Sequence, residues 1–492
     1  MKGLRFIGLA LLACVLGASM AAMAQSWSSV TASPEAIGPM LQLRDGRILA
    51  HSDQGGNANH WYILSPDANG KYETGTWTGP YSMQAGYAPF FFSSAVLTDG
   101  KTIVAEGGEY NNGSAVWTTI GSQGTVTPWA GMTWVVNSPP SGWSTIGDAQ
   151  AVVLGDGTYF QADCCSKKTA YRNGANSWTA GPNVLAVRND ESGWSTLPDG
   201  RVMMVDVQNN TNCSSAKSSE YYDFNGDKAW HCGPQLTQQL WQQSDQELGS
   251  GTVFYPSANH PKGGMFQMGG NVIASNVLDI NSFTWATGPT LGSYQQADGP
   301  GAVEPNGKVL VQISPGLFNS GCTYAEFDPV AGTLAATVNN LFCPADSSYV
   351  GHLLLFPTGQ VGSMDYDVNI QLYNPTPGVV AGVAPTIIPA SNAYLGGSKN
   401  NILYGIQLNG LSEGAFYGDD LQAATNYPLI RFTNSDGKVW YAFTHDDSTH
   451  SMAPGKVSYT KFDINPATPP GTYQMQAVTN GIPSNSVTVK IR

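Results

Sequence analysis

The stretch Leu97-Thr98-Asp99-Gly100-Lys101-Thr102-Ile103-Val104-Ala105-Glu106-Gly107-Gly108 decides the fold. An apolar run over residues 90–97 meets the two-residue turn Asp99-Gly100, and a second apolar run ends at the pair Gly107-Gly108. Asp and Gly accept the positive φ angles of a tight turn, so the two runs are predicted to pair as a β-hairpin. The two successive glycines allow a neighbouring backbone to approach closely.

The same unit recurs along the chain. Its turns lie at residues 45, 99, 156, 199, 262, 306 and 358, which are 43 to 63 residues apart. Periods of roughly 40–50 residues built from short strands are typical of propeller blades. Unrelated hairpins would also carry Asp-Gly turns, but a near-regular array favours a repeat. The sequence therefore predicts an all-β fold in which residues 25–380 form a seven-bladed kelch-type β-propeller. Residues 26–32 are predicted to complete the last blade and close the ring.

The pattern changes after a Gly-, Val-, Ala- and Pro-rich linker that ends near Pro385. Residues 385–492 contain short apolar-rich segments at regular intervals, with almost no helical pattern. Such segments are typical of strands in a two-sheet sandwich. The last part of the chain is therefore predicted to be an immunoglobulin-like (E-set) β-sandwich. We expect it to pack on the side or rim of the propeller opposite the mouth, as support.

The first 24 residues read as a secretory signal peptide of the bacterial type. Lys2 and Arg5 precede an apolar run over residues 6–15, and small residues end in Ala22-Met23-Ala24. A basic start, a short apolar core and an A-x-A end predict cleavage before Gln25. A lipoprotein signal through Cys14 is the alternative. The apolar run is shorter than the roughly 20 residues of a membrane-spanning helix, and no later stretch is apolar enough to be one. The protein is thus predicted to be secreted or periplasmic.

Composition excludes some partners and indicates disulfides. The net charge of −13 argues against binding to nucleic acid or to anionic membrane surfaces. Six of the seven cysteines follow the predicted signal peptide, and export makes disulfides plausible. Local spacing suggests the pairs Cys213–Cys232 and Cys322–Cys343. The adjacent Cys164 and Cys165 either form a vicinal disulfide or stay free.

The C-terminal part carries motifs that resemble the galactose oxidase/glyoxal oxidase family, especially its bacterial kelch-containing members. The motifs are Tyr417-Gly418-Asp419-Asp420, Asn426-Tyr427-Pro428-Leu429-Ile430-Arg431 and Asn480-Gly481-Ile482-Pro483-Ser484. Together with the glycine pairs of the blades, they extend the resemblance over essentially all of the predicted mature chain. The resemblance implies a propeller followed by an Ig-like domain. It also implies an oxidase of alcohols or aldehydes with one copper ion and a tyrosyl radical, which needs soft and imidazole ligands.

Counting back from each turn places the family's copper site on this chain. The cysteine position falls near Phe91, the position of its cross-linked tyrosine near Asp148, and the Tyr-His pair on Tyr349-Val350. The remaining imidazole candidates are His352, which lies two residues beyond Val350 on the same strand face, and two histidines of the C-terminal part, His445 and His450. The copper set is therefore predicted to be incomplete, and surface positions are the alternative for the last two histidines.

Carboxylates precede the predicted inner strands of successive blades, where a propeller brings chain segments to its axis. They are Asp148, Asp190, Glu191, Asp245, Glu247, Asp298 and, further back, Asp346. Crowded carboxylates repel one another unless a cation lies among them, and calcium takes six to eight oxygen ligands. A carboxylate pair for acid/base chemistry on a sugar and a merely solvated acidic mouth are the alternatives. Aromatic residues are expected near the same mouth, among them Tyr87, Phe90, Phe91, Trp194, Tyr255, Tyr294 and Tyr349.

These patterns predict an exported protein that binds carbohydrate or cell-envelope material at an acidic propeller mouth, without copper-radical chemistry. The predicted ligand-binding residues are Asp148, Asp190, Glu191, Asp245, Asp298, Trp194 and Tyr349. The alternatives are a copper-radical oxidase with an altered ligand set and a carboxylate-based carbohydrate enzyme. For an enzyme, the catalytic candidates are Asp148, Glu191, Asp298 and Tyr349, and the candidate copper ligands are His352, His445 and His450.

Overall fold

The computed structural model describes residues 25–53, 58–174, 176–207, 212–213, 216–242, 247–338, 343–417, 423–452 and 455–492. The predicted signal peptide, residues 1–24, and Asp245 lie outside these ranges. The described chain is nearly all β, with two short 3₁₀ helices, η1 (Cys343–Ala345) and η2 (Ser348–Val350). In this part of the chain no helix has the length and apolar character needed to cross a lipid bilayer.

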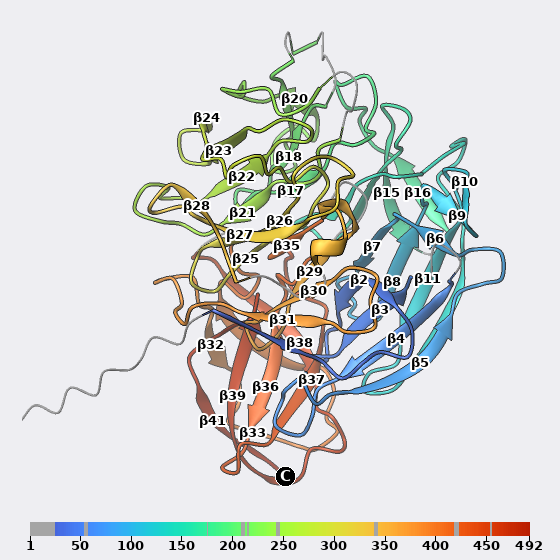
Figure 1. Ribbon diagram of the computed structural model, residues 1–492. Helices are drawn as coiled ribbons and strands as arrows, with labels where there is room; N and C mark the ends of the chain where they lie inside the picture. Colours follow the sequence, from blue (N-terminus) through green and yellow to red (C-terminus); the bar gives the residue numbers. More distant parts are fainter. Residues whose placement is uncertain are drawn as a thin grey trace, which may run out of the picture.

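Antiparallel sheets with simple up-and-down order follow one another along residues 26–374 (Figure 1). The first is β2 (Ile37–Gln42), β3 (Ile48–Ser52), β4 (His60–Ser65) and β5 (Thr76–Ser82). The second is β7 (Ser93–Val96), β8 (Thr102–Glu106), β11 (Gly121–Val126) and β12 (Met132–Asn137). The third is β13 (Ala151–Val153), β14 (Tyr159–Ala162), β15 (Thr169–Gly174) and β16 (Ser177–Ala180). The fourth is β17 (Trp194–Thr196), β18 (Val202–Val205), β19 (Ser219–Tyr222) and β20 (Trp230–Cys232).

The later sheets repeat this order, with two additions. The fifth is β21 (Thr252–Phe254), β22 (Gly264–Met268), β23 (Ser275–Asp279) and β24 (Thr284–Thr287). The sixth is β25 (Gly301–Val303), β26 (Val309–Ile313), β27 (Thr323–Asp328) and β28 (Thr333–Ala336), extended by β35 (Ala415–Phe416). The next is β29 (His352–Leu355), β30 (Val361–Met364) and β31 (Gln371–Asn374), completed by β1 (Ser26–Ser29). A small sheet of β6 (Pro89–Phe90), β9 (Tyr110–Asn111) and β10 (Ser114–Ala115) stands beside the second.

The predicted hairpin turns connect the first and second strands of these sheets. Their glycines all have positive φ, between 75° and 92°, a conformation that disfavours any residue with a Cβ. These glycines are Gly46, Gly100, Gly157, Gly200, Gly263, Gly307 and Gly359. The hairpin prediction is therefore confirmed at each of the seven turns.

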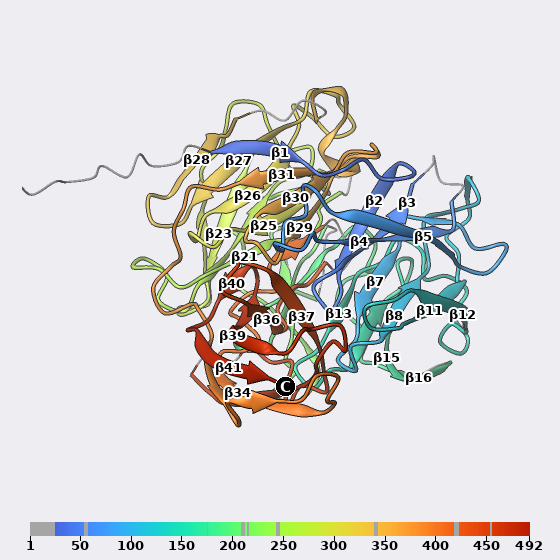
Figure 2. The ribbon, with the colours of Figure 1, turned by 90° about the horizontal axis from the view of Figure 1, so that it is seen from below.

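The first strands of the sheets contact one another in a closed cycle. β2 contacts β7, and the cycle continues through β13, β17, β21, β25 and β29 back to β2. The cycle closes because β1 pairs with β31, in the register Ser26↔Asn374 to Ser29↔Gln371, and this confirms the predicted pairing of the N-terminal segment (Figure 2). Sheets arranged radially around their first strands constitute a β-propeller.

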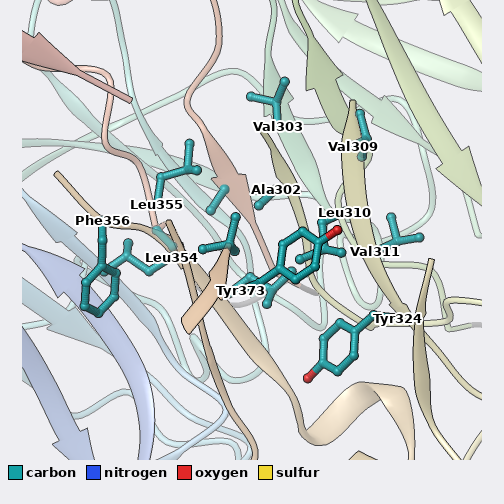
Figure 3. Close-up of a cluster of buried hydrophobic side chains, with 14 of the residues drawn as sticks. Ala302, Val303, Val309, Leu310, Val311, Tyr324, Leu354, Leu355, Phe356 and Tyr373 are labelled. Carbon is teal, nitrogen blue, oxygen red and sulfur yellow. The ribbon is translucent and has the colours of Figure 1, made fainter. Parts of the chain in front are cut away.

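Apolar side chains of neighbouring sheets fill the space between them. Figure 3 shows part of the largest buried cluster, which joins β25, β26, β29 and β31. Tyr373 is buried in it and donates its hydroxyl to Glu326 at 2.5 Å. Three disulfides, Cys164–Cys165, Cys213–Cys232 and Cys322–Cys343, confirm the pairs suggested by spacing and settle the vicinal pair as bonded.

The C-terminal part forms a second all-β unit with a buried core of its own. Its strands are β32 (Thr386–Pro389), β33 (Ala393–Tyr394), β34 (Asn401–Ile406), β36 (Leu429–Thr433), β37 (Val439–His445), β38 (Val457–Asp463), β39 (Gly471–Thr479), β40 (Ile482–Pro483) and β41 (Val487–Ile491). All pairs are antiparallel except β33 with β41. In Figure 1 this unit, in orange to red, lies below the propeller sheets.

The hairpin turns of the propeller face this C-terminal unit. A Cβ placed on Gly46 would lie 2.6 Å from the Tyr441 ring, and one on Gly481 would lie 2.5 Å from the backbone of Gly359. Arg44, at the start of a turn, forms a buried ion pair of 2.5 Å with Asp447, both side chains being at most 1% exposed. The two units are thus joined by closely packed backbone and by a buried charge pair.

One segment of the C-terminal unit enters the centre of the propeller. Ser412 donates its hydroxyl to Val253 at 2.7 Å, and the Glu413 carboxylate accepts the backbone N–H of Thr196 at 2.9 Å. β35 then pairs with β25, the first strand of the sixth sheet. The segment therefore contacts the first strands of three neighbouring sheets, β17, β21 and β25, and continues to Tyr417.

We predict that Asp447→Asn lowers the free energy of unfolding by about 3–5 kcal/mol, because it leaves the Arg44 guanidinium buried without its counter-charge. The matched control is Asp199→Asn in the Arg201–Asp199 pair, whose side chains are 37% and 19% exposed for Asp and Arg. That change should cost less than about 1 kcal/mol. Urea unfolding followed by tryptophan fluorescence measures both, and equal losses would contradict a buried ionic joint.

Candidate functional site

The residues that precede the first strands line one cavity of about 490 Å³, here called the hub cavity. Its lining has three parts. The acidic group comprises Glu109, Asp148, Glu191, Glu247 and Asp298. The aromatic wall comprises Phe90, Phe91, Tyr110, Phe318, Tyr349, Tyr366 and Tyr417. Gly113 and Val350 complete the lining. This volume and this mixture of apolar surface with a few polar groups are typical of small-molecule sites.

Backbone contacts between neighbouring loops bring three of the carboxylates together. Ser192 forms a parallel bridge with Leu248, and the N–H of Gly249 donates to the carbonyl of Ala297 at 3.3 Å. Ser192, Leu248 and Ala297 are each next in sequence to a carboxylate of the cavity, and Gly249 is two residues beyond one. These three, here called the carboxylate trio, are Glu191, Glu247 and Asp298, and one oxygen of each lies within 4.8 Å of the others.

Glycine pairs make these close approaches possible, as the sequence predicted. A Cβ on Gly270 would lie 1.7 Å from the carbonyl oxygen of Glu247, so only glycine leaves room for that backbone. In the second sheet, the N–H of Gly108 donates to the carbonyl of Gly147 at 3.0 Å. The residues that follow, Glu109 and Asp148, both line the hub cavity.

The aromatic wall is a connected set of rings. The rings of Phe91 and Tyr349 are 6.1 Å apart, and that of Phe318 meets Tyr349 edge-on at 5.3 Å. Phe90 contacts Phe91 at 4.1 Å and Tyr366 at 5.2 Å. Phe318 is 56% exposed, so the wall offers apolar surface to a ligand from solvent.

Tyr417 comes from the segment that enters the propeller centre, and it fixes one part of the wall. Its hydroxyl donates to the backbone carbonyl of Tyr349 at 2.6 Å. Its ring lies 4.3 Å from that of His352, which is 3% exposed and is not part of the cavity lining. Burial lowers the pKa of His352 to about 4, so this imidazole is neutral at neutral pH.

Burial and crowding of like charges raise the pKa of Glu109. Desolvation is the larger cause, the charges of Glu247 and Asp190 add to it, and a hydrogen bond with Tyr110 opposes it; the resulting pKa is about 7. The pKa of Tyr349 is also raised, first by burial and then by Asp346, Glu109 and Glu247. In both groups desolvation is the larger cause of the raised pKa, and nearby negative charges add to it.

Four of the sequence-predicted residues line the hub cavity, namely Asp148, Glu191, Asp298 and Tyr349. Two do not line the cavity, and ligand contact by them stays a prediction. Asp190 is buried and forms an ion pair of 2.8 Å with Arg188. Trp194 is 3% exposed and packs in the core between sheets, 4.9 Å from Phe160. Asp245, the remaining predicted residue, lies outside the described ranges.

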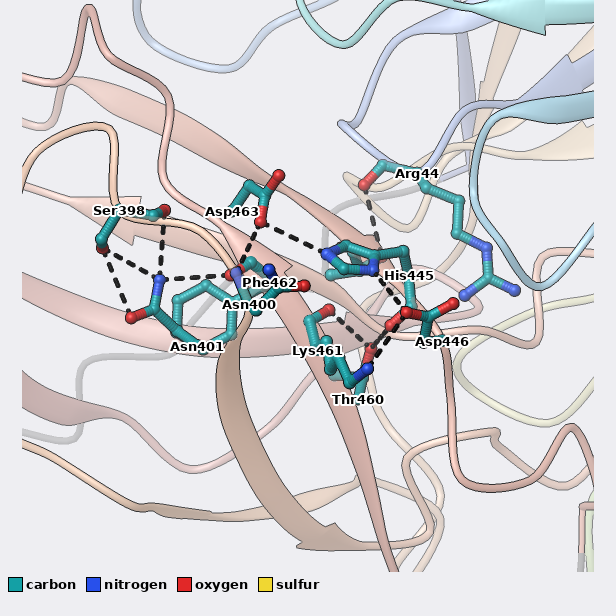
Figure 4. Close-up of polar contacts among 11 residues, drawn as sticks. Arg44, Ser398, Asn400, Asn401, His445, Asp446, Thr460, Lys461, Phe462 and Asp463 are labelled. Atoms are coloured by element: carbon teal, nitrogen blue, oxygen red, sulfur yellow. Dashed lines mark hydrogen bonds and ion pairs between the residues drawn. The ribbon is translucent and has the colours of Figure 1, made fainter.

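The two C-terminal histidines also lie away from the cavity lining. His445 is held between Asp446, at 3.1 Å, and Asp463, at 3.3 Å, within the C-terminal unit (Figure 4). His450 is 4% exposed, and burial lowers its pKa to about 4, with the charge of Arg44 adding to the shift. The alternative that these two histidines lie on the surface is therefore wrong, because both are buried. Both serve the packing of the C-terminal unit.

The donor set of the cavity does not fit a copper-radical centre. Phe91, Asp148, Tyr349 and Val350 line the cavity, so the family's ligand positions coincide in space, but the described lining offers neither thiol nor imidazole. Carboxylate and phenol oxygens suit hard cations such as calcium, whereas imidazole and thiolate suit copper. The carboxylate trio is the group whose chemistry would fit calcium.

Sequence reasoning missed several residues of the lining. Glu109 and Tyr110 follow the Gly107-Gly108 pair, which indicates close backbone packing but not contact with a ligand. Phe318 and Tyr366 lie in irregular loops. Tyr417 belongs to a motif that carried the family resemblance, but its entry into the propeller has no local signal.

No protein-family model matches the chain, and no curated protein matches it. Solved structures with similar folds include a streptogramin B lyase, at 10% identity and a TM-score of 0.45 over 72% of this chain and 99% of that one. The structure of YCF48 bound to D1 peptide matches at 13% sequence identity and a TM-score of 0.45, over 71% of this chain and 95% of that one. The structure of a catalytically inactive virginiamycin B lyase from Staphylococcus aureus with quinupristin matches at 7% sequence identity and a TM-score of 0.47, over 71% of this chain and 99% of that one. These values are too low to transfer any activity.

We predict that Glu109→Gln removes part of the pH dependence of stability. Folding raises the pKa of Glu109 from 4.5 to about 7, so the folded state binds the proton more tightly. Its stabilising contribution is complete below about pH 4.5 and is lost as the pH rises through about 7. The groups that surround Glu109 are Glu247, Asp190, Asp148, Tyr110 and Tyr349. With these neighbours the net shift of its pKa is upward, so stability falls as the pH rises.

The measurement is urea unfolding of wild type and variant between about pH 4.5 and 8. The variant should equal wild type at the acidic end and exceed it at the basic end, because the amide carries no charge. A constant difference across the range would show that Glu109 is not a buried, crowded carboxylate.

Proposed function

We propose that this protein is exported and binds carbohydrate or related cell-envelope material in the hub cavity, without copper-radical chemistry. In this proposal the main part of the chain is a seven-bladed kelch-type β-propeller, and residues 385–492 are an Ig-like (E-set) domain that supports it. The closed cycle of first strands and the repeated hairpins favour the propeller, and the separate C-terminal core favours the second domain.

One observation carries the functional proposal: a single cavity combines an aromatic wall with five carboxylates supplied by five successive sheets. Flat rings cover the apolar faces of sugar rings, and carboxylate oxygens accept hydrogen bonds from sugar hydroxyls. The half-exposed Phe318 at the edge of the wall gives such a ligand its first contact.

A carboxylate-based carbohydrate enzyme is the second candidate. Its specific support is the pKa of Glu109, about 7, which is suited to proton transfer near neutral pH, together with the other carboxyl groups that line the same cavity. Incubation of a bound oligosaccharide with the protein, followed by mass spectrometry, separates the two. An unchanged mass supports binding, and cleavage or elimination products support catalysis.

Phe318→Ala should weaken binding of an oligosaccharide by roughly 3- to 10-fold, the loss of about one aromatic contact. The probe is an array of oligosaccharides that includes neutral, N-acetylated and amine-bearing sugars, followed by calorimetry on the strongest binder. Tyr404→Ala, which removes an aromatic side chain 41% exposed on the C-terminal unit, is the matched control and should change nothing. An array on which wild type gives no more signal than the Phe318 variant would defeat the proposal.

A further inference from the structure

The lining of the hub cavity carries charge of one sign. The lining has five carboxyl groups, and the described part of it contains no lysine, arginine or histidine. A ligand that enters the cavity removes water from these groups. A cationic group on the ligand would add a favourable electrostatic interaction with this acidic lining that a neutral sugar lacks.

The carboxylate trio has dimensions that suit an ammonium group. Because its three oxygens lie within 4.8 Å of one another, some point lies no more than about 2.8 Å from all three. That is the N⁺–H···O⁻ distance of a charge-assisted hydrogen bond. A primary ammonium has three N–H donors and no acceptor, so it can donate one to each carboxylate.

The aromatic wall argues for an organic cation rather than a bare metal ion. A metal site needs oxygen ligands and no apolar surface, whereas Phe318, Phe91 and Tyr349 offer ring faces and edges within 5.3 and 6.1 Å of one another. Such rings attract cations and cover the apolar side of a ligand body. A cavity of about 490 Å³ also exceeds the needs of one ion.

We infer that the hub cavity selects ligands that carry a protonated primary amine, with the ammonium at the carboxylate trio and the ligand body against the aromatic wall. This inference rests on the proposed function and narrows it to amino sugars with a free amine. The same ammonium chemistry could come from an aliphatic polyamine, and the experiment distinguishes these two sources.

The test is calorimetry at about pH 6, where a sugar amine is protonated, with a matched pair of ligands. One is the β-1,4-linked disaccharide of glucosamine, and the other is its N,N′-diacetyl form, which has the same rings without the charges. We expect the amine to bind at least tenfold more tightly. Glu247→Gln should abolish this preference by lowering the affinity for the amine form to about that of the diacetyl form. Asp436→Asn, an exposed carboxylate in the turn between β36 and β37, is the control.

Each outcome decides between the two proposals. Equal affinity for both disaccharides, unaffected by Glu247→Gln, overturns the ammonium inference and leaves carbohydrate binding intact. Binding of spermidine but of neither disaccharide supports the ammonium site and overturns the carbohydrate proposal. Binding of calcium chloride alone overturns the inference in favour of a metal site. Asp298→Asn repeats the test should the first variant fail to fold, as judged by its thermal transition.

Discussion

Pairing of β1 with β31 is the constraint on which the arrangement of this molecule depends. Four residues of an N-terminal strand complete the sheet that ends at Asn374, and so the strand that leads into the first sheet is hydrogen-bonded to the last one. Closure places β29 against β2, and every first strand then has two neighbours around a common centre. Without this closure, the loops ahead of the first strands would not be held around one common centre.

Convergence in turn explains how the hub cavity is built from residues far apart in the sequence. Asp148, Glu191 and Asp298 each lie three residues ahead of a first strand, on three different sheets. Backbone bridges between neighbouring loops and the absence of a side chain at Gly270 hold them close. Folding thus brings acidic groups together, and the raised pKa of Glu109 has desolvation as its larger cause and the charges of Glu247 and Asp190 as the smaller one.

The C-terminal unit takes part in the same construction. Its joint to the hairpin turns, around the buried pair of Arg44 and Asp447, fixes where the segment around Ser412 enters the propeller. That segment delivers Tyr417 to the cavity, where its hydroxyl donates to the backbone carbonyl of Tyr349. The unit is therefore a support that also supplies one side chain of the lining.

Local chemistry made much of this predictable. Asp-Gly turns fix a hairpin within a few residues, and counting back from them located Asp148, Glu191, Asp298 and Tyr349. The rest depends on long-range packing. Trp194 was expected near the mouth but is buried against Phe160. Tyr417 reaches the cavity through a chain path that no local pattern encodes, and His445 is satisfied by carboxylates of its own unit.

The most direct test of the account is a crystal structure of the protein grown with the glucosamine disaccharide. The account predicts sugar density in the hub cavity, with an amine nitrogen within about 3 Å of the carboxylates of Glu191, Glu247 and Asp298 and a ring of the aromatic wall against the sugar face. Sugar bound only elsewhere on the surface, or a metal ion held by these three carboxylates in its place, would contradict it.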